Sequence, residues 1–331
     1  QGEPRRRRVD LERAAELEAR ARAFGLAPEP GGVRWLDVGT QLRLVESPLD
    51  IAQAIQARVF TDDKAAAKTW IFTSATLGDD AQLSWFTQPC GLTGATTLQV
   101  GSPFDYARQA AFYIPRNFPK PGEPSHTAAV ASSAADWARR LGGRTMVLTT
   151  TLRALRAIGD ALKASFENST EIEVLVQGAM PKRTLIERFR QADSHGGRGC
   201  VLVASASFWE GIDVPGDALQ LVIIDKLPFP PPNDPMVEAR SRLLESEGKS
   251  AFNDYFLPEA AVALKQGAGR LIRRETDQGV LVVCDSRLAS MGYGKRLLRA
   301  LPPMQRLASE EELNERLDLL TRTCTRAHPP T

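Results

Sequence analysis

The sequence predicts an α/β protein built on a parallel sheet with helices on both faces. From residue 126 onward, short apolar runs alternate with helix-favouring stretches, which is the order expected of strands joined by crossover helices. The apolar runs are continuous rather than alternating with polar residues, as in strands buried on both faces. At 331 residues the chain is long enough for about two domains.

The first third of the chain is less regular. Residues 1–33 contain the run Arg5 to Arg8 and a charged stretch that favours helix, so we expect an exposed, partly helical segment. Residues 33–45 alternate as a strand does, and Ser47-Pro48 predicts a helix start. Strands are expected at 69–73 and 98–100, with a helix near 80–87.

The rest of the chain carries the regular alternation, after a proline-rich stretch between residues 103 and 124 that suits a linker. We expect strands at 144–149, 172–176, 200–204, 219–225 and 279–284. We expect helices at 126–141, 151–166, 181–191, 234–247, 258–273 and 292–300.

Composition narrows the class of protein. The formal net charge is only +2, so any nucleic-acid binding must come from a local groove. There is no apolar run of membrane-spanning length and no signal-peptide pattern, and we expect a cytoplasmic location. The four cysteines are widely separated, which predicts reduced core residues at Cys200 and Cys284 and no metal site. His126, His195 and His328 are isolated, and we expect them on the surface or in loops.

One basic run stands out. In residues 266–274, a helix would place Gln266, Gly269, Arg270 and Arg273 on one face. Two adjacent guanidinium groups repel one another unless an anion lies between them, and a phosphate group suits that role. The alternative is an ordinary solvated basic helix end.

Two further segments have the residue pattern of ligand-binding loops, in which an apolar run is followed by small hydroxyl residues and glycine. The apolar run 200–204 opens into the Ser/Gly-rich residues 205–216, and the apolar run 70–72 opens into Thr73 to Gly78. A loop that follows a buried strand is where open α/β sheets place their ligands.

The amino-acid sequences of these segments resemble the motifs of a known family. Thr73-Ser74-Ala75-Thr76-Leu77, Phe208-Trp209-Glu210-Gly211-Ile212-Asp213 and Gln266-x-x-Gly269-Arg270-x-x-Arg273 are similar to motifs III, V and VI of superfamily-two helicases. Together with Asp225-Lys226-Leu227-Pro228-Phe229-Pro230, they resemble the DinG/YoaA branch of the XPD-like DNA helicases.

The resemblance covers most of residues 34–305 and implies a RecA-like fold. It implies that residues 34–105 are the end of a first RecA-like domain and 106–305 a second one. Residues 1–33 would then be the charged N-terminal segment and 306–331 a C-terminal tail.

The resemblance also implies roles for individual residues. Arg270 and Arg273 would stabilise the transferring γ-phosphoryl group of ATP, Gln266 would bond near that phosphate, and Gly269 would permit close packing. Gly211 and Asp213 would face the nucleotide, although Asp213 also reads as a turn residue before Pro215. Glu210 would pair with an arginine or support catalysis. Ser74, Ala75 and Thr76 would couple the nucleotide to the nucleic-acid groove.

A third group of residues would bind DNA. Thr149-Thr150-Thr151 matches motif IV, and its hydroxyl and backbone N–H groups suit a DNA phosphate, while N-capping of the following helix by one of the three is a second interpretation that is compatible with the first. Gln177 follows the next strand in the same way. Ser205, Ser207 and Trp209 would meet backbone and bases, with a buried Trp209 as the alternative.

The family resemblance implies an ATP-dependent 5′-to-3′ DNA helicase that acts as a monomer on single-stranded or forked DNA in repair or replication. The chain has no Gly-x-x-x-x-Gly-Lys-Ser/Thr phosphate loop and no Asp-Glu-x-His segment, so ATP and Mg²⁺ would be held mainly by residues upstream of Gln1. An iron–sulphur cluster would also lie upstream. We expect a piece of a longer protein that is inactive alone.

Two other functions remain open. The missing phosphate loop favours a non-catalytic module that binds single-stranded nucleic acid, whereas the arginine pair argues against it. An unrelated nucleotide-binding α/β enzyme is a weaker option, because no Gly-x-Gly-x-x-Gly follows a strand.

Overall fold

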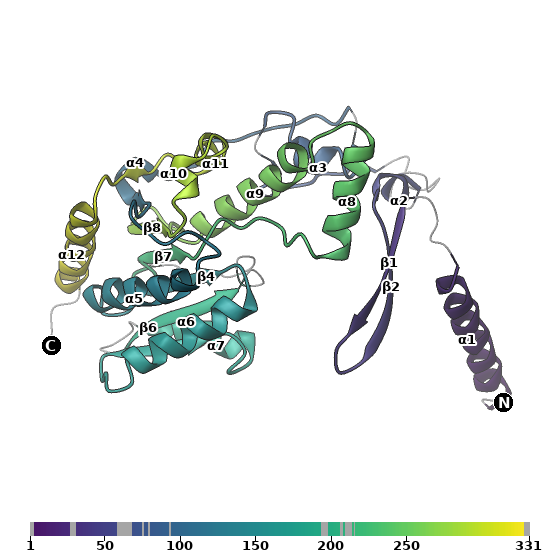
Figure 1. The fold of residues 1–331 in the computed structure, drawn as a ribbon, viewed down its shortest axis with the longest axis horizontal. Coiled ribbons are helices and arrows are strands. Elements are labelled where there is room, and N and C mark those ends of the chain that lie inside the picture. Colours follow the sequence, from purple (N-terminus) through teal and green to yellow (C-terminus); the bar gives the residue numbers. More distant parts are fainter. Residues whose placement is uncertain are drawn as a thin grey trace. The chain divides into compact units, whose positions relative to one another are not determined.

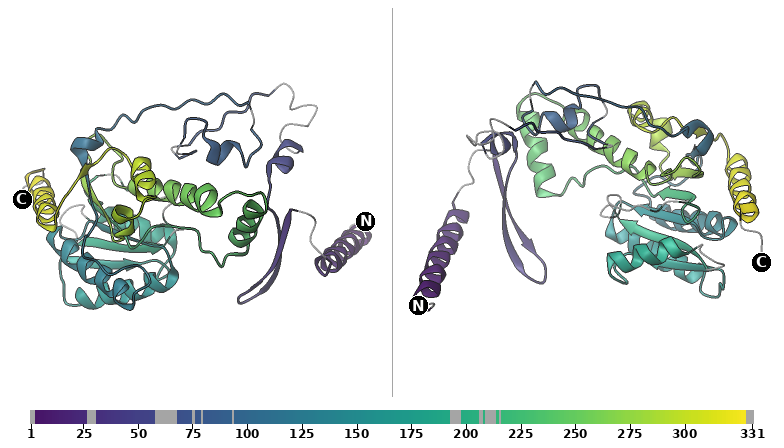
Figure 2. Two further views of the ribbon diagram at one scale, coloured as in Figure 1. Left: turned by 45° about the horizontal axis from the view of Figure 1, so that its top comes forward. Right: turned by 180° about the vertical axis from the view of Figure 1, so that it is seen from behind.

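The computed structural model describes residues 3–26, 31–57, 68–74, 76–78, 80–92, 94–192, 198–205, 208, 214 and 216–327, with the backbone alone for 3–10 and 323–327. The chain forms two compact units (Figures 1 and 2). Unit 1 comprises Gln1–Thr73, Gln82–Thr96 and Pro230–Phe256; unit 2 comprises Ser74–Ala81, Thr97–Phe229 and Leu257–Thr331. The domain limits expected at residues 34, 106 and 306 stay predictions.

Unit 2 is built on a seven-stranded sheet with the order β5-β6-β4-β7-β8-β3-β9. Every pairing in it is parallel. The strands are β3 (Ala110–Tyr113), β4 (Thr145–Thr149), β5 (Ile172–Val176), β6 (Gly199–Ser205), β7 (Leu221–Ile224), β8 (Gly279–Val283) and β9 (Gln305–Arg306). The predicted parallel α/β sheet is therefore confirmed, with β3 and β9 in addition.

Helices cover both faces of this sheet (Figure 1). Met146 and Leu148 on β4 belong to one core, whereas Val147 between them belongs to the other, as the alternation of a strand requires. The first core includes residues of α7 (Lys182–Gln191), α9 (Leu257–Ala268), α10 (Arg287–Ser290) and α11 (Gly294–Ala300). The second includes residues of α5 (Pro124–Arg140), α6 (Leu152–Ser165) and α12 (Glu310–Ala327).

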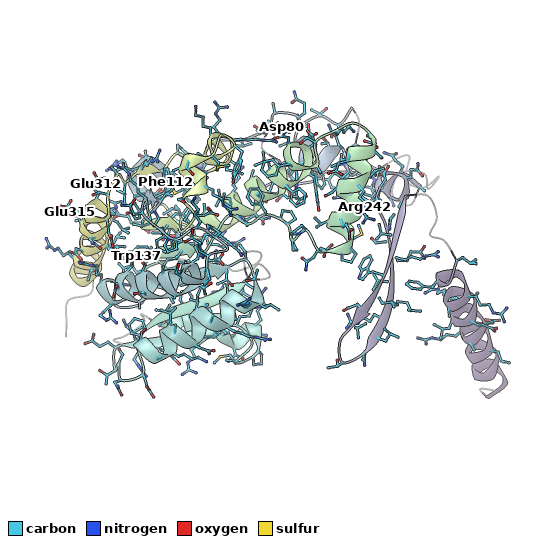
Figure 3. The ribbon with its side chains drawn as sticks, viewed as in Figure 1. Asp80, Phe112, Trp137, Arg242, Glu312 and Glu315 are labelled. Atoms are coloured by element: carbon cyan, nitrogen blue, oxygen red, sulfur yellow. The ribbon has the colours of Figure 1, made fainter. Side chains whose placement is uncertain are left out.

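Helix α12 lies within the segment that was expected as a C-terminal tail after residue 305. Leu313, Leu317 and Leu320 are at most 1% exposed and complete the second core, while Glu312 and Glu315 of the same helix are exposed (Figure 3). The spacing of three or four between the leucines is that of one helical face. The segment is therefore part of the folded unit.

Unit 1 contains smaller elements. They are α1 (Glu3–Phe24), β1 (Gly32–Val38), β2 (Leu42–Pro48), α2 (Ala52–Ile55), α3 (Ser84–Thr87), α8 (Pro235–Ser246) and the π-helix η3 (Phe252–Phe256). The single strand expected at 33–45 is an antiparallel hairpin, because the chain turns between β1 and β2. Ser47 lies in β2 and does not cap a helix.

Three expected elements near the unit boundaries are corrected. Residues 69–73 and 98–100 belong to no helix or strand and pair with no strand among the described residues. An apolar composition favours a strand but does not supply the neighbouring backbone that a strand needs. The helix expected near 80–87 is only the four residues of α3.

The parallel sheet divides its loops into two groups. The strands all end at one side, here called the carboxyl edge, and begin at the other, the amino edge. Thr149, Ser205 and Ile224 end strands at the carboxyl edge, whereas the loops that lead into β7 and β8 lie at the amino edge. The predicted site residues are distributed over both edges. None of the described helices is long and apolar enough to cross a membrane.

Candidate functional site

The two arginines of the basic run lie in a loop at the amino edge and not on a helix. Helix α9 ends at Ala268, and residues 269–278, here called the arginine loop, lead into β8. The backbone N–H of Arg270 bonds to Gly267 O at 3.2 Å, a short-range bond that closes the last turn. The predicted helix to residue 273 is therefore wrong.

The arginine loop is anchored between its two arginines. Leu271 and Ile272 are each 2% exposed and belong to the first core. The side chains of Arg270 and Arg273 are half-buried, and their Nε atoms are fully covered. A pair of guanidinium groups on a backbone fixed by two buried neighbours has little freedom, which suits recognition of one anion in one place.

A buried carboxylate fixes the backbone of this loop. Asp277 Oδ2 accepts the backbone N–H of Arg273 at 2.8 Å and of Arg274 at 2.9 Å. Its Oδ1 accepts the N–H of Gly216 at 3.2 Å, from the connection that precedes β7. Asp277 is only 4% exposed. This role of Asp277 was not predicted from the sequence, although an acid among arginines directly before an apolar strand was an available signal.

A buried amide holds the other side of the same loop. Gln109, the last residue of α4 (Tyr106–Gln109), is 7% exposed. Its Nε2 lies 3.0 Å from each of three loop carbonyl oxygens, those of Arg274, Glu275 and Asp277. Nothing in the sequence pattern indicated this contact, because it joins residues 165 or more positions apart.

The structure brings two of the helicase-like segments together. Gln266 Nε2 on α9 lies 3.4 Å from Thr76 Oγ1, across 190 positions of sequence. The backbone N–H of Thr76 in turn donates to Ser74 Oγ at 3.2 Å. Ser74, Thr76 and Gln266 all belong to unit 2. The contact joins the predicted coupling segment to the helix that carries the arginine loop.

At the carboxyl edge, three consecutive threonines have different roles. Thr149 is fully buried and its hydroxyl lies 3.3 Å from the carbonyl oxygens of Thr151 and Ala204, which contradicts a contact of that hydroxyl with DNA. Thr151 caps α6, because its hydroxyl accepts the N–H of Ala154 at 3.2 Å. Thr150 is half-buried and bonds to Asp225. The capping reading is thus confirmed for Thr151.

Gln177 and Ser205 form a second pair at this edge. Gln177 Oε1 accepts the backbone N–H of Ser205 at 2.7 Å and its hydroxyl at 2.9 Å. Ser205 is 8% exposed and Gln177 is half-buried. Beside them, Lys182 Nζ lies 4.7 Å from the centre of the Phe208 ring, a cation–π contact that holds a positive charge near the ends of β5 and β6.

Asp225 is the most perturbed acid of the site. It is 2% exposed, and burial raises its pKa to about 7 despite the nearby Lys226 and bonds from Lys226 and Thr150. Its Oδ1 accepts the N–H groups of Thr150 at 3.0 Å and Lys226 at 2.8 Å. Asp225 therefore ties the end of β4 to the segment that follows β7.

Asp285 anchors the same segment from the next strand. It is fully buried, and its Oδ2 accepts the N–H of Leu227 at 2.9 Å and Arg287 Nη2 at 2.7 Å. The Arg287 guanidinium also lies 5.9 Å from the centre of the Phe229 ring. Two buried carboxylates thus fix the Asp225–Pro230 segment at the carboxyl edge.

Six predicted site residues lie outside the described part of the chain: Ala75, Ser207, Trp209, Glu210, Gly211 and Asp213. Phe208 and Val214 beside them are each 3% exposed and belong to the first core.

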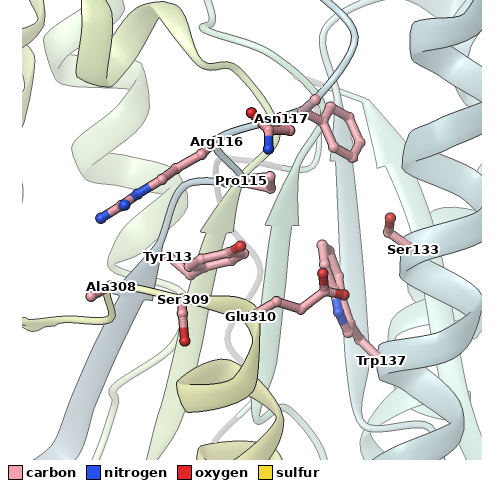
Figure 4. A pocket seen from close by; sticks show the side chains of 10 residues that line it. Tyr113, Pro115, Arg116, Asn117, Ser133, Trp137, Ala308, Ser309 and Glu310 are labelled. Carbon is pink, nitrogen blue, oxygen red and sulfur yellow. The ribbon is translucent and has the colours of Figure 1, made fainter.

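A pocket of about 270 Å³ lies elsewhere in unit 2, and none of the predicted site residues lines it (Figure 4). Its lining residues are Tyr113, Pro115, Arg116, Asn117, Phe118, Ser133, Trp137, Ala308, Ser309 and Glu310. Among the described residues, no group of three or more His, Cys, Asp or Glu side chains could hold a metal ion.

Comparison with known proteins identifies the family of this chain. A family model described as "Helicase C-terminal domain" matches residues 135–304. YoaA of Escherichia coli K12, an ATP-dependent DNA helicase, is 37% identical over 299 residues, which cover 89% of this chain and 45% of that protein. DinG of Mycobacterium tuberculosis H37Ra, an ATP-dependent helicase, is 35% identical over 310 residues, which cover 91% of this chain and 45% of that protein.

The chain thus spans about half the length of these relatives. Among solved structures, an XPD helicase aligns with 60% of this chain and 36% of its own, at 19% identity and a TM-score of 0.42. The family model matches the part of the chain that contains the arginine loop, Asp225 and the Gln177–Ser205 pair. The chain therefore belongs to the helicase C-terminal domain family, and it is similar over about nine-tenths of its length to YoaA and DinG proteins.

Proposed function

We propose that this chain supplies the second RecA-like domain of an ATP-dependent DNA helicase and closes one side of its ATP site. The observation that carries the proposal is the arginine loop, in which Arg270 and Arg273 flank two buried anchors. The Gln266–Thr76 contact supports it, because it joins the arginine helix to the segment expected to couple ATP to DNA. The names of the relatives point to the same activity.

The residues present fit the phosphate end of ATP but not its metal ion. Arg270 and Arg273 would stabilise negative charge on the γ-phosphoryl group as it transfers, a role worth roughly 10³–10⁵ in rate for an arginine finger. Gln266 would bond near that group, while Gly211, Asp213 and Glu210 would approach the nucleotide. The chain has no phosphate loop, and its described residues hold no acidic metal cluster.

Single-stranded DNA is the proposed ligand of the carboxyl edge. Thr150 and Gln177 are half-buried there, and their hydroxyl and amide groups suit contacts to a DNA backbone, while the buried Ser205 would hold Gln177 in place. Ser207 and Trp209 would extend this surface. Ser74, Ala75 and Thr76 would couple it to ATP. We include in the proposal 5′-to-3′ movement by a monomer on single-stranded or forked DNA during repair or replication.

The test removes the arginines in the full-length protein. We expect Arg270→Ala and Arg273→Ala each to lower DNA-stimulated kcat by roughly 10³-fold, with the Kd for an oligonucleotide within about twofold of wild type. Arg274→Ala is the matched control, because this arginine lies in the same loop with an exposed side chain. ATPase activity that survives both substitutions would remove the arginines from catalysis.

A second function is a non-catalytic module that binds single-stranded nucleic acid, favoured by the missing phosphate loop. The same assay separates the two functions. Oligonucleotide binding by a full-length protein without any ATPase activity would support the module and refute the helicase.

A further inference from the structure

The pocket of about 270 Å³ in unit 2 has two buried hydrogen-bond donors on its wall. Tyr113 at the end of β3 is 6% exposed, and Trp137 on α5 is 3% exposed. Among the described residues, neither the Tyr113 hydroxyl nor the Trp137 indole N–H has a hydrogen-bond partner. Because buried polar groups are normally bonded, two such donors at one pocket point to a ligand that offers hydrogen-bond acceptors.

The apolar part of the same wall suits a proline-containing peptide. Pro115 and Phe118 line the pocket, and the Phe118 ring packs edge-to-face on His126, with 5.7 Å between the ring centres. A polyproline II segment has no internal hydrogen bonds, so its carbonyl oxygens are available, and such segments dock in aromatic-lined grooves. A volume below about 300 Å³ is small for a whole drug-sized ligand and suits one or two side chains of a peptide.

The charge of the pocket favours a basic peptide. Glu310, the first residue of α12, lines it, and among the described residues the Glu310 carboxylate has no hydrogen bond or ion pair. Burial and the charges of Glu310 and Glu311 raise the pKa of the Tyr113 hydroxyl, which therefore stays a donor at neutral pH. Arg116 lowers that pKa by less, and its guanidinium points away from Glu310 (Figure 4).

We propose that this pocket docks a basic, proline-containing segment of a partner protein. Carbonyl oxygens of the segment accept hydrogen bonds from Tyr113 and Trp137, and an arginine or lysine beside the prolines pairs with Glu310. A nucleobase also offers acceptors, but the Glu310 carboxylate repels the phosphates that flank a base. The site is separate from the proposed ATP and DNA sites, because none of the residues assigned to them lines the pocket.

The experiment measures binding of a synthetic peptide to the full-length protein by fluorescence anisotropy. The probe is a labelled peptide of sequence Arg-Pro-Pro-Pro-Pro-Arg, which offers a cation at either end, whichever way the segment lies. One comparison peptide carries glutamate in place of both arginines, and another carries alanine in place of the prolines. We expect the Kd of each comparison peptide to be at least about tenfold higher than that of the probe.

Single substitutions test the named side chains. Tyr113→Phe keeps the ring and removes the hydroxyl, and it should raise the Kd of the probe about fivefold, as for one lost hydrogen bond. Glu310→Gln should raise it about fivefold and remove most of its dependence on salt. Glu315→Gln is the matched control, because this acid is exposed on the same helix and outside the pocket. It should stay within about twofold of wild type.

Three results would overturn the proposal. The first is a wild-type protein that does not bind the probe. The second is binding that is unchanged in both Tyr113→Phe and Glu310→Gln, measured on variants whose unfolding temperatures match wild type, since the peptide would then bind elsewhere. The third is an oligothymidine whose binding, in contrast to that of the probe, is weakened by Tyr113→Phe, which would assign the pocket to a nucleobase. None of these results depends on the ATPase assay of Arg270→Ala.

Discussion

At the scale of the residue, Asp225 is a buried acid whose ionisation opposes folding. Its pKa rises from about 3.8 to about 7 on burial, so the folded chain keeps a proton that the unfolded chain releases between about pH 4 and pH 7. The contribution of this group to the free energy of unfolding therefore falls as the pH rises through that window. The bonds from Thr150 and Lys226 reduce this cost without cancelling it.

Asp225→Asn tests this linkage. The amide oxygen can keep both backbone bonds, and its NH₂ group can donate to Thr150 Oγ1, so the geometry should survive. We expect the unfolding free energy of wild type, minus that of the variant, to fall by up to about 4 kcal/mol between pH 4 and pH 7. Urea unfolding at several pH values measures it, with the exposed Glu167→Gln as control. A difference independent of pH would contradict the shift.

The burial of individual polar residues was harder to predict from the sequence than that of apolar ones. His126 was expected in a loop or on the surface, yet it is 4% exposed and its Nε2 lies 2.9 Å from Cys284 O. Cys200 and Cys284 are core residues as expected, and burial raises the pKa of the Cys200 thiol to about 12. The apolar neighbours of the two cysteines predicted their burial. Nothing in the sequence around His126 indicated that its ring would be buried against a backbone carbonyl oxygen.

Among the secondary-structure elements, the bodies of the helices could be predicted from the sequence, whereas their ends were harder to predict. Helix α6 begins after Thr151, whose hydroxyl accepts the N–H of Ala154. Helix α9 ends five residues before the expected position, where short-range bonds from Arg270 to Gly267 and from Leu271 to Ala268 close it. Termini depend on a few local bonds, whereas the body of a helix is set by the repeated pattern of its apolar face.

Thr151→Ala measures the cap of α6. Loss of the hydroxyl leaves the Ala154 N–H without its acceptor, and we expect a cost of about 1 kcal/mol in unfolding free energy. Thr170→Ala is the control, since Thr170 is exposed and lies outside helices and strands. Equal denaturation midpoints for the two variants would show that Thr151 does not stabilise the helix.

At the scale of the whole molecule, the sheet of unit 2 is complete only when both ends of its sequence are present. Strand β3 comes from the segment expected to be a linker, β9 from residues just before the expected tail, and α12 closes the second core. Residues 110–113 and 305–306 are too short to show a pattern of their own, and pairing with β8 and with each other makes them strands.

Leu317→Ala tests whether α12 is part of the folded unit. Leu317 is fully buried in the second core, and its truncation should cost about 2–5 kcal/mol of unfolding free energy. Leu319→Ala on the same helix is the matched control, because that side chain is 49% exposed. We expect the control to cost well under half as much in the same denaturant titration. Equal costs would mean that α12 does not depend on this packing.

The fold class, the strands β4 to β8 and the family resemblance could be predicted from the amino-acid sequence alone, because each depends on a local pattern of apolar runs, glycines and charged residues. The loop position of Arg270 and Arg273, the burial of Thr149 and the bonds by which Asp277 and Gln109 hold that loop could be seen only in the folded structure. These features depend on hydrogen bonds between residues brought together by the sheet, and a partner 55, 61 or 165 positions away leaves no trace in a local pattern.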